Sequence, residues 1–322
     1  MTSHCEGEVW GLDVVTISKG EYRVLTSADD NRILAYNPTT NMALAEGIVN
    51  KLPTKPVKEK AGFRGGASSM SNLPASNQSR CVVYNAALQH LAVADNKGHV
   101  TIREIDWNAV DARTPGSLDN VKKTLFKELK DKARWIEVMV FSPDSKHLAI
   151  GSHDDNIYLC DTKTYKKHIK LSGHSSYITA IDWAADCSYI RTVCGAYELL
   201  FFDINKKKRD PSGASKTIPT IWADQTCKLG WSVQGIFPPG CDGSHINSVC
   251  MTADQSLLAS GDDYGLVCLY RNPVLDGHAS GKYRGHSEHV TRVKFSDDSK
   301  YVFSTGGQDQ VTIQWQKKAG KK

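Results

Sequence analysis

The chain has 322 residues, of which 40% are hydrophobic and 8% aromatic, an ordinary globular composition with enough apolar mass for a large core. No run approaches the roughly 18 consecutive apolar residues of a transmembrane helix, and the N-terminus lacks the basic start and apolar core of a signal peptide. No membrane partner is therefore expected. A formal net charge of +5 permits an acidic partner without requiring one.

The nine cysteines are scattered, and no two form a C-x-x-C pair. Most of them fall inside strand-like runs, as Cys160, Cys250 and Cys268 do. Cysteines of this kind behave as small buried hydrophobes in a reducing compartment. The expected location is therefore the cytoplasm.

Six segments share one pattern, in which short runs of β-branched and aromatic residues alternate with turns rich in Gly, Asp and Ser. In chain order they cover residues 7–37, 81–106, 135–161, 173–203, 246–271 and 285–315. Each segment is followed by residues that can supply a fourth strand. A repeat of about 40 to 45 residues with four strands is typical of a β-propeller. The predicted fold is all-β, a single WD-repeat β-propeller spanning residues 4–316.

Two segments interrupt the early repeats, and a short tail follows the last one. Residues 51–80 are rich in Pro, Gly, Ser and Lys, which predicts a flexible basic insertion. Residues 106–119 form a second loop. The next stretch, "NVKKTLFKELKDKAR", has the pattern of an amphipathic helix, but the repeat context favours the outer strand of a blade. Residues 317–322 are expected to form a basic C-terminal tail.

Residues 205–245 contain no clean repeat. They do hold two β-prone pieces, "TIPTIWA" and "LGWSVQGIF", separated by turn residues. Six regular copies together with this segment predict seven blades, one of them irregular. The alternative is a ring of six blades with a long excursion.

The last repeat carries residues that look at first like a catalytic or metal site. In WD-repeat propellers a Gly-His pair precedes the first strand, an Asp lies in the turn before the third, and a strand hydroxyl and a terminal Trp complete a hydrogen-bonded set. Because the pattern recurs along this chain, a structural role is favoured over catalysis or metal binding. The predicted blade network consists of His174, His286, Thr305, Asp309, Trp315, Asp30 and Asp154.

No catalytic motif is present. The chain has no G-x-x-x-x-G-K-[ST], no G-x-S-x-G and no H-E-x-x-H. Paired acids at 29–30, 154–155 and 262–263 recur at corresponding turns, which favours turn capping over a pair of catalytic carboxylates. The protein is not expected to be an enzyme, and no catalytic residue, metal or cofactor is predicted.

Several motifs together resemble the C-terminal propeller of the echinoderm microtubule-associated protein-like family. They include "SGHSSYITAIDW", "YELLFFD", "LLASGDDYGLVCLY" and "GHSEHVTRVKF…STGGQDQVTIQW", and "FSPDSKHLAIGSHDDNIYL" and "GEVWGL" follow the same order upstream. The most specific is "IWADQTCKLGWSVQGIFPPGCDGSHINSVC", because generic WD repeats would not reproduce it. The resemblance covers nearly the whole chain and implies an atypical blade in this irregular segment.

The chain also departs from the family pattern. Ala196 stands where the turn Asp is expected, so the blade formed by residues 173–203 is expected to lack the full network. Family members usually carry two propellers in tandem and often a coiled coil. This chain is expected to be one propeller, either a short member or a C-terminal portion of a longer one.

Loops at the faces of a propeller present a rigid, variable surface for protein partners. The candidate partner-binding residues are basic loop residues, namely Lys55, Lys58, Lys60, Arg64, Lys206, Lys207, Lys208 and Arg209. Tubulin has an acidic surface, so basic loops would accelerate association and make binding sensitive to salt. Together with the resemblance, this predicts a non-enzymatic, structural or stabilising protein that binds tubulin and microtubules.

Two other functions compete with microtubule binding. The first is a generic interaction scaffold or adaptor that does not bind tubulin directly. The second, nucleic-acid binding, is disfavoured because the aromatic residues lie in strand positions and are not interleaved with the basic loops. The resemblance implies a place on the cytoskeleton, with the cilium or flagellum and other axonemal proteins as the more specific location and partners.

Overall fold

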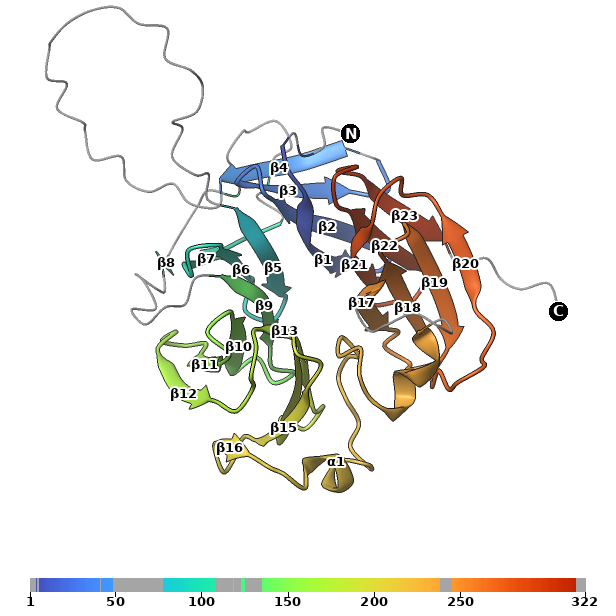
Figure 1. Ribbon diagram of the computed structural model, residues 1–322. Helices are drawn as coiled ribbons and strands as arrows, with labels where there is room; N and C mark the ends of the chain where they lie inside the picture. The colour runs from blue at the N-terminus through green and yellow to red at the C-terminus, as the bar shows by residue number, and fades with distance from the viewer. Residues whose placement is uncertain are drawn as a thin grey trace, which may run out of the picture.

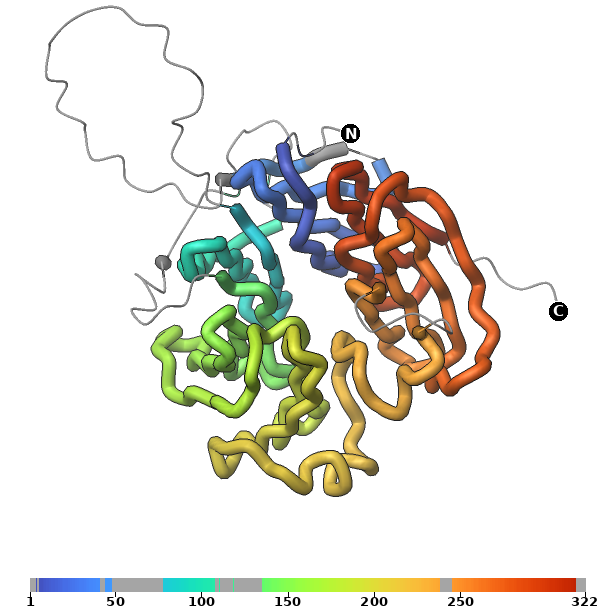
Figure 2. Tube along the Cα trace, viewed as in Figure 1, coloured from blue at the N-terminus to red at the C-terminus, as the bar shows by residue number. Residues whose placement is uncertain are grey.

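The computed structural model describes residues 4, 6–40, 42–48, 78–107, 110, 118, 123–124, 135–237 and 245–316. Six antiparallel sheets in the described part of the chain stand around a common axis as six blades (Figure 1). The trace passes once around the ring, and the first blade lies beside the last (Figure 2). This confirms an all-β fold with a single propeller.

Blades 1 to 3 each contain four strands. Blade 1 consists of β1 (Val9–Ser18), β2 (Glu21–Ala28), β3 (Arg32–Asn37) and β4 (Met42–Ile48). Blade 2 consists of β5 (Ser79–Asn85), β6 (His90–Asp95), β7 (Val100–Glu104) and β8 (Lys123–Thr124). Blade 3 consists of β9 (Ile136–Phe141), β10 (His147–Ser152), β11 (Ile157–Asp161) and β12 (Lys167–Leu171). The stretch at 120–134 thus supplies an outer strand, β8, as its repeat context predicted.

Blades 4 and 5 also have four strands, and blade 6 has three among the described residues. Blade 4 consists of β13 (Ile178–Trp183), β14 (Tyr189–Cys194), β15 (Leu199–Asp203) and β16 (Lys208–Arg209). Blade 5 consists of β17 (Ile246–Met251), β18 (Leu257–Asp262), β19 (Leu266–Arg271) and β20 (Gly281–Arg284). Blade 6 consists of β21 (Val290–Phe295), β22 (Tyr301–Gly306) and β23 (Thr312–Gln316).

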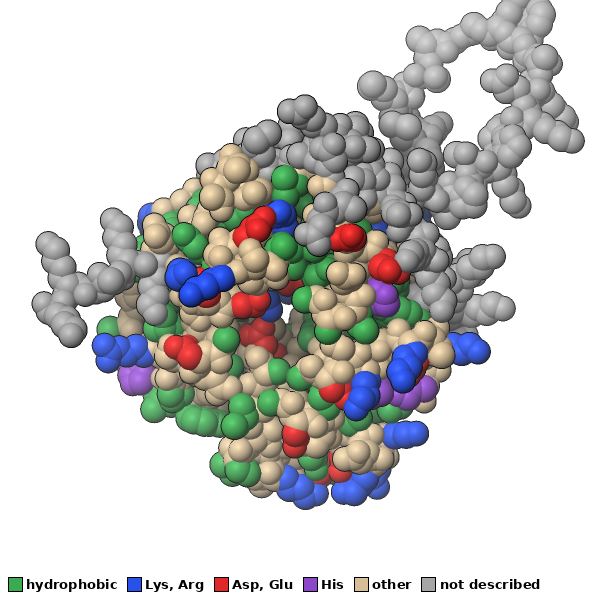
Figure 3. Space-filling model, turned by 180° about the vertical axis from the view of Figure 1, so that it is seen from behind, with side chains coloured by type: hydrophobic (Ala, Val, Ile, Leu, Met, Phe, Trp, Pro, Cys, Tyr) green, Lys and Arg blue, Asp and Glu red, His purple; other side chains and the backbone are tan. Residues whose placement is uncertain are grey.

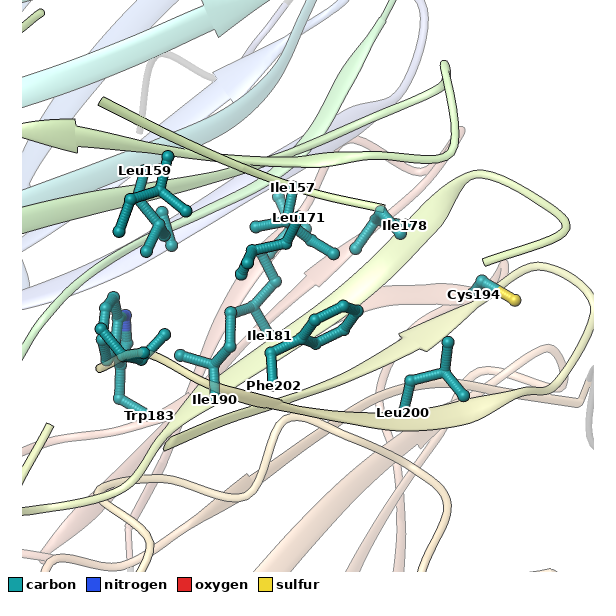
Figure 4. Packing of buried hydrophobic residues seen from close by; sticks show 14 residues of the cluster. Ile157, Leu159, Leu171, Ile178, Ile181, Trp183, Ile190, Cys194, Leu200 and Phe202 are labelled. Atoms are coloured by element: carbon teal, nitrogen blue, oxygen red, sulfur yellow. The ribbon is translucent and has the colours of Figure 1, made fainter. Parts of the chain in front are cut away.

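The core lies between the faces of neighbouring blades. Each second strand is buried along nearly its whole length, as Leu148, Ala149 and Ile150 of β10 show, because adjacent blades cover both of its faces. Between blades 3 and 4, Leu159 packs in one cluster with Trp183 and Phe202 (Figure 4). Burial of each such side chain contributes about 1.5–3 kcal/mol. The blades are therefore stabilised mainly by their neighbours.

The ring closes between blade 6 and blade 1 through both polar and apolar contacts. The Thr291 hydroxyl donates to the carbonyl of Val9, and Gln310 Nε2 donates to the carbonyl of Gly7 at 2.9 Å. Phe303 of blade 6 is fully buried in a cluster with residues of blade 1, including Tyr22.

The prediction of seven blades is wrong, and the alternative of six blades with a long excursion describes the structure. Within the irregular segment, β16 is the outer strand of blade 4. Residues 210–237, here called the connector, contain the short helix α1 (Gly213–Lys216) and the 3-10 helix η1 (Trp231–Ile236). The connector bridges blades 4 and 5, and its β-prone pieces form no sheet of their own. Neither described helix is long enough to cross a membrane.

The connector is held by hydrogen bonds to both neighbouring blades. Ala223 N donates to the carbonyl of Trp183 at 2.9 Å, and Thr226 N donates to Asp182 Oδ1 at 2.7 Å, so its backbone is tied to β13. On the other side, Lys228 Nζ donates to the carbonyl of Ile246 at 2.7 Å. Carboxylates and single carbonyls thus replace the strand partners that a seventh blade would have supplied.

Candidate functional site

The predicted basic segment 206–209 lies at the outer edge of blade 4. Lys208 and Arg209 form the short strand β16, and both are exposed. Lys206 Nζ lies 2.9 Å from Asp203 Oδ2, and the hydrogen bond to this carboxylate raises the pKa of Lys206. Lys206 therefore stays cationic at every physiological pH.

The neighbouring blade 3 extends this basic surface. In its outer strand β12, Lys167, His168 and Lys170 are exposed, whereas Ile169 and Leu171 pack inward. We define the basic rim as the exposed cations of strand β12 and the turn before it, of residues 206–209 and of helix α1, namely Lys163, Lys166, Lys167, Lys170, Lys206, Lys207, Lys208, Arg209 and Lys216. Lys and Arg side chains gather along the corresponding lower and right-hand edge of Figure 3.

Carboxylates partly offset the charge of the basic rim. Lys206 is paired with Asp203, and Lys216 Nζ lies 2.7 Å from Asp210 Oδ2. Two of the nine cations are held in this way. Surface pairs of this kind contribute little to stability and are screened by salt. The rim keeps a clear excess of positive charge.

The connector exposes large apolar side chains beside the basic rim. Ile218 is 71% exposed, Ile221 65% and Trp231 60%. Burying a side chain of this size is favourable, so such exposure marks a candidate contact surface for another protein.

The other predicted basic residues are not all placed by the structure. Lys55, Lys58, Lys60 and Arg64 lie outside the described residues, as does the tail at 317–322. The predicted C-terminal boundary of the insertion, residue 80, overlaps strand β5, which begins at Ser79.

Arg80, at the end of that expected insertion, is an ordered strand residue. Its guanidinium lies 3.9 Å from the ring centre of Trp10 and 4.4 Å from that of Trp135. Asp29 Oδ1 lies 3.9 Å from its Nε. Arg80 is therefore held among blades 1, 2 and 3 and differs from the exposed cations of the basic rim.

A cavity of about 260 Å³ lies on the propeller axis, lined by the innermost strands of the blades. Its charged residues are largely paired: Lys294 Nζ lies 2.9 Å from Asp224 Oδ2, and Arg191 Nε donates to Asp182 Oδ2 at 2.9 Å. Burial raises the pKa of Asp13 to about 6, and this carboxyl accepts a hydrogen bond from Tyr84 N at 2.7 Å. The first of these contacts joins blade 6 to the connector, the second lies within blade 4, and the third joins blades 1 and 2.

The paired acids hold turns in place. Asp262 accepts hydrogen bonds from the backbone of Tyr264 at 2.9 Å and of Leu266 at 2.8 Å. Asp29 accepts one from the backbone of Glu8 at 3.2 Å. Asp262 thereby occupies backbone donors of its own turn, whereas Asp29 holds the segment just before β1.

Blade 6 contains a continuous network between its loop, its strands and its last aromatic residue. His286 Nδ1 lies 3.0 Å from Asp309 Oδ2, and His286 Nε2 lies 2.7 Å from Ser304 Oγ. Trp315 Nε1 donates to the same Ser304 hydroxyl at 2.7 Å. The placement of Thr305 in this network is wrong: its hydroxyl contacts that of Thr291 at 2.9 Å, because neighbouring strand residues point to opposite faces.

Blade 1 repeats this arrangement with a histidine that the sequence analysis missed. His4 Nδ1 lies 3.0 Å from Asp30 Oδ1, and its Nε2 lies 2.9 Å from Thr26 Oγ1. In blade 3, Asp154 contacts the hydroxyl of Tyr158 and accepts a hydrogen bond from Asn156 N at 3.3 Å. Among the residues that the structure describes, no histidine contacts Asp154 as His286 contacts Asp309 in blade 6.

In blade 4 the histidine position is kept while the acid differs. His174 Nε2 lies 2.6 Å from Thr192 Oγ1, and Nδ1 faces Glu198 Oε2 at 3.6 Å. Glu198 follows the expected acid position at Ala196 by two residues, and its longer side chain reaches back toward the histidine. Burial lowers the pKa of His174, although the nearby Glu198 acts in the opposite direction.

A sequence profile of the second β-propeller of echinoderm microtubule-associated proteins matches residues 9–317. The chain belongs to this family. The match spans all six blades, including the connector that bridges blades 4 and 5.

Similar proteins include the ciliary WD repeat-containing protein ctxp80 of Euplotoides octocarinatus, which is 43% identical over 321 residues, covering 99% of this chain and 41% of that protein. The 77 kDa echinoderm microtubule-associated protein of Lytechinus variegatus is 38% identical over 204 residues, 62% of this chain and 31% of that protein. The echinoderm microtubule-associated protein-like 2 of Rattus norvegicus is 41% identical over the same shares. The chain spans less than half the length of these relatives.

The sequence analysis named only four of the nine cations of the basic rim, those at 206–209. The run "TKTYKKHIK", with its lysines at 163, 166, 167 and 170, carried a signal that was not used. From His168 to Leu171, polar and apolar residues alternate, which is typical of an outer strand that packs one face and exposes the other. The sequence signal for His4 was weaker. His174 and His286 each follow a glycine, whereas His4 follows a serine.

Proposed function

We propose that this propeller binds tubulin on the microtubule lattice as a non-enzymatic structural component, with the basic rim as its contact surface. The carrying observation is the group of nine exposed cations on the outer edge of blades 3 and 4, in a chain of a microtubule-associated family. An acidic lattice would attract such a surface over a range of about a Debye length, roughly 8 Å at physiological salt. Binding is therefore expected to be saturable and to weaken with salt.

The connector supports the same proposal. Charged contacts supply association rate and orientation, whereas affinity usually requires some buried apolar area. Ile221 and Trp231 offer such area in the segment that directly follows the rim residue Lys216. Lys55, Lys58, Lys60 and Arg64 remain predicted additional contacts on the same acidic partner.

The cytoskeleton is the proposed location, and the axoneme of cilia or flagella is its more specific form. The similarity to a protein named as ciliary supports this choice. Other axonemal proteins are then proposed partners, whereas nucleic acid and membranes are not.

The exposed apolar residues of the connector also favour a second candidate, a scaffold that binds a protein other than tubulin. In that case the apolar surface would supply most of the affinity and the cations of the rim would matter little. The two candidates differ in how binding depends on salt and on charge.

The experiment is co-sedimentation of the purified chain with stabilised microtubules across a salt series. The test variant carries Lys206→Gln, Lys207→Gln, Lys208→Gln and Arg209→Gln. The control variant carries Lys19→Gln, Lys97→Gln, Lys282→Gln and Arg284→Gln, which removes the same charge from exposed positions of blades 1, 2 and 5. We expect at least a roughly tenfold loss of affinity for the rim variant, and a much smaller one for the control.

Equal losses of affinity in the two variants would show that binding depends on the net charge of the chain and not on where the charges lie. This outcome would contradict the proposal that the basic rim is the contact surface. No binding by the folded wild-type chain would contradict direct tubulin attachment and leave the scaffold as the function to test. Both variants change only exposed side chains, so their melting temperatures should stay close to the wild-type value.

A further inference from the structure

Blade 4 contains a cluster of three potential metal ligands at one end of the blade. His174 lies in the loop before β13, Cys194 ends β14, and Glu198 lies in the turn before β15. One ligand atom of each residue lies within 4.8 Å of the other two. Glu198 Oε2 is 3.3 Å from Cys194 Sγ and 3.6 Å from His174 Nδ1.

The equivalent positions of blades 1 and 6 show what is unusual here. In both of those blades the histidine Nδ1 contacts an aspartate oxygen at 3.0 Å. In blade 4 the acid has withdrawn to 3.6 Å, and the thiol of Cys194 lies beside the gap. At the aligned strand end, blade 6 has Gly306 and blade 1 has Ala28, neither of which can bind a metal.

His174 points an unsatisfied nitrogen into this gap. Its side chain is fully buried, and Nδ1 has no hydrogen-bond partner at normal distance among the residues that the structure describes. The other nitrogen, Nε2, is fixed by the Thr192 hydroxyl at 2.6 Å. An unpartnered buried polar atom costs about 1–3 kcal/mol, so a missing ligand at Nδ1 is a physical explanation for it.

The distances suit a tetrahedral zinc ion. Bonds of about 2.1 Å to nitrogen and oxygen and about 2.3 Å to sulfur give ligand separations of about 3.4 Å between N and O and about 3.6 Å between S and O. The observed separations, 3.6 Å and 3.3 Å, lie within a few tenths of an ångström of these values. Imidazole, thiolate and carboxylate together favour Zn²⁺ over the harder cations Mg²⁺ and Ca²⁺.

We propose that His174, Cys194 and Glu198 bind one Zn²⁺ ion, with water as the fourth ligand. Binding releases the Cys194 thiol proton to solvent, and His174 coordinates through the lone pair of Nδ1. The Glu198 side chain is 37% exposed, which provides the entry path and the open position for water. Thr192 orients the imidazole, and Ser175 N, which donates to Glu198 Oε2 at 2.8 Å, orients the carboxylate.

Such an ion would link the loop before β13 to the end of β14 and the start of β15, next to the basic rim. It would replace the hydrogen-bonded acid of the other blades with a stronger crosslink. The site is structural in kind, and it is independent of the proposed binding to tubulin.

The test is metal binding by the full reduced chain after removal of metal with a chelator. Zn²⁺ is titrated in competition with a chromophoric zinc chelator, and Co²⁺ is added separately to record the near-ultraviolet absorption of a thiolate-to-cobalt bond. The variants are Cys194→Ser and Glu198→Gln, and the control is Cys187→Ser, a cysteine at the opposite end of the same blade. We expect one equivalent of Zn²⁺ to bind to the wild-type chain and to Cys187→Ser.

Cys194→Ser should lose the cobalt band, and both site variants should bind Zn²⁺ at least about tenfold more weakly. Glu198 is partly exposed, so its isosteric variant tests the site even if the buried serine disturbs folding. A wild-type chain that binds no Zn²⁺ below millimolar concentration, or a cobalt band that survives in Cys194→Ser, would overturn the proposal.

Discussion

Blades 4 and 6 share one framework of a histidine, a strand hydroxyl and an acid in the following turn, but they complete it differently. In blade 6 the acid is Asp309, and the Ser304 hydroxyl joins His286 to Trp315. All four side chains are connected, from the loop before β21 to the end of β23. A network with every member satisfied fixes the geometry of its blade.

Blade 4 leaves its network open. His174 keeps its contact with Thr192, but the acid Glu198 lies beyond hydrogen-bond distance. Phe202 of β15 stands where blade 6 has Trp315, and its ring has no N–H group to donate to the strand hydroxyl. This blade carries four of the nine cations of the basic rim and borders the connector. The comparison indicates that the polar network stabilises blade 6, whereas neighbouring apolar packing stabilises blade 4.

The largest expected effect comes from removing the aromatic end of the blade 6 network. Trp315→Ala should destabilise the chain by about 2–4 kcal/mol, because it removes the hydrogen bond to Ser304 and the packing against Val302 and its cluster. The partial exposure of Trp315 places this value below that of a fully buried tryptophan. Urea denaturation at equilibrium measures the change.

A second tryptophan serves as the control for this substitution. Trp231 is 60% exposed, so Trp231→Ala should change the free energy of unfolding by less than about 0.5 kcal/mol. Similar losses of unfolding free energy in the two variants would mean that the blade 6 network adds no stability beyond that of an exposed tryptophan in the connector.

The next effect compares the acids of the two blades directly. Asp309→Ala should cost about 1–3 kcal/mol, because it leaves His286 buried without its partner. Glu198→Ala in the metal-free chain should cost clearly less than Asp309→Ala, because His174 Nδ1 has no close partner to lose. Thermal or urea unfolding of both variants at pH 7 measures the difference. Equal costs would contradict the view that blade 4 has an open network.

The regular blades were predictable because their signals are local. Each strand pairs with the next one along the chain, so the period of the repeat predicts the sheet directly. His286, Asp309 and Trp315 could be placed together for the same reason. The choice between Ser304 and Thr305 could not be made, since both carry a hydroxyl and only the register of β22 decides which one faces His286.

The connector was misread because its structure depends on distant residues. Its β-prone composition suggested strands, but the backbone of Thr226 and Cys227 bonds to the carboxylate of Asp182, more than forty residues earlier in the chain. A side chain that replaces a strand partner leaves no periodic pattern in the sequence. The same holds for Glu198, whose role depends on a turn in which Tyr197 has a positive φ of 60°.

The smallest expected effect is a pH dependence that both histidines share. Burial lowers the pKa of His174 and of His286 below the ordinary value of 6.5. Because the unfolded chain then binds protons more readily, stability is fully present above pH 6.5 and falls as the pH drops toward the folded pKa values. The slope is at most about 1.4 kcal/mol per pH unit for each histidine.

Denaturation at several values between pH 7.5 and pH 5.5 measures this dependence. The variant His174→Asn should lose less stability on acidification than the wild type, and His286→Asn should behave likewise. Partial burial also lowers the pKa of His147, which lies in neither network, so His147→Asn gives the contribution of a half-buried histidine outside them. A wild-type curve that stays flat over this range would show that neither network histidine resists protonation. An unchanged slope in His286→Asn alone would show that Asp309 offsets burial in blade 6, and the two blades would then differ in charge as well as in geometry.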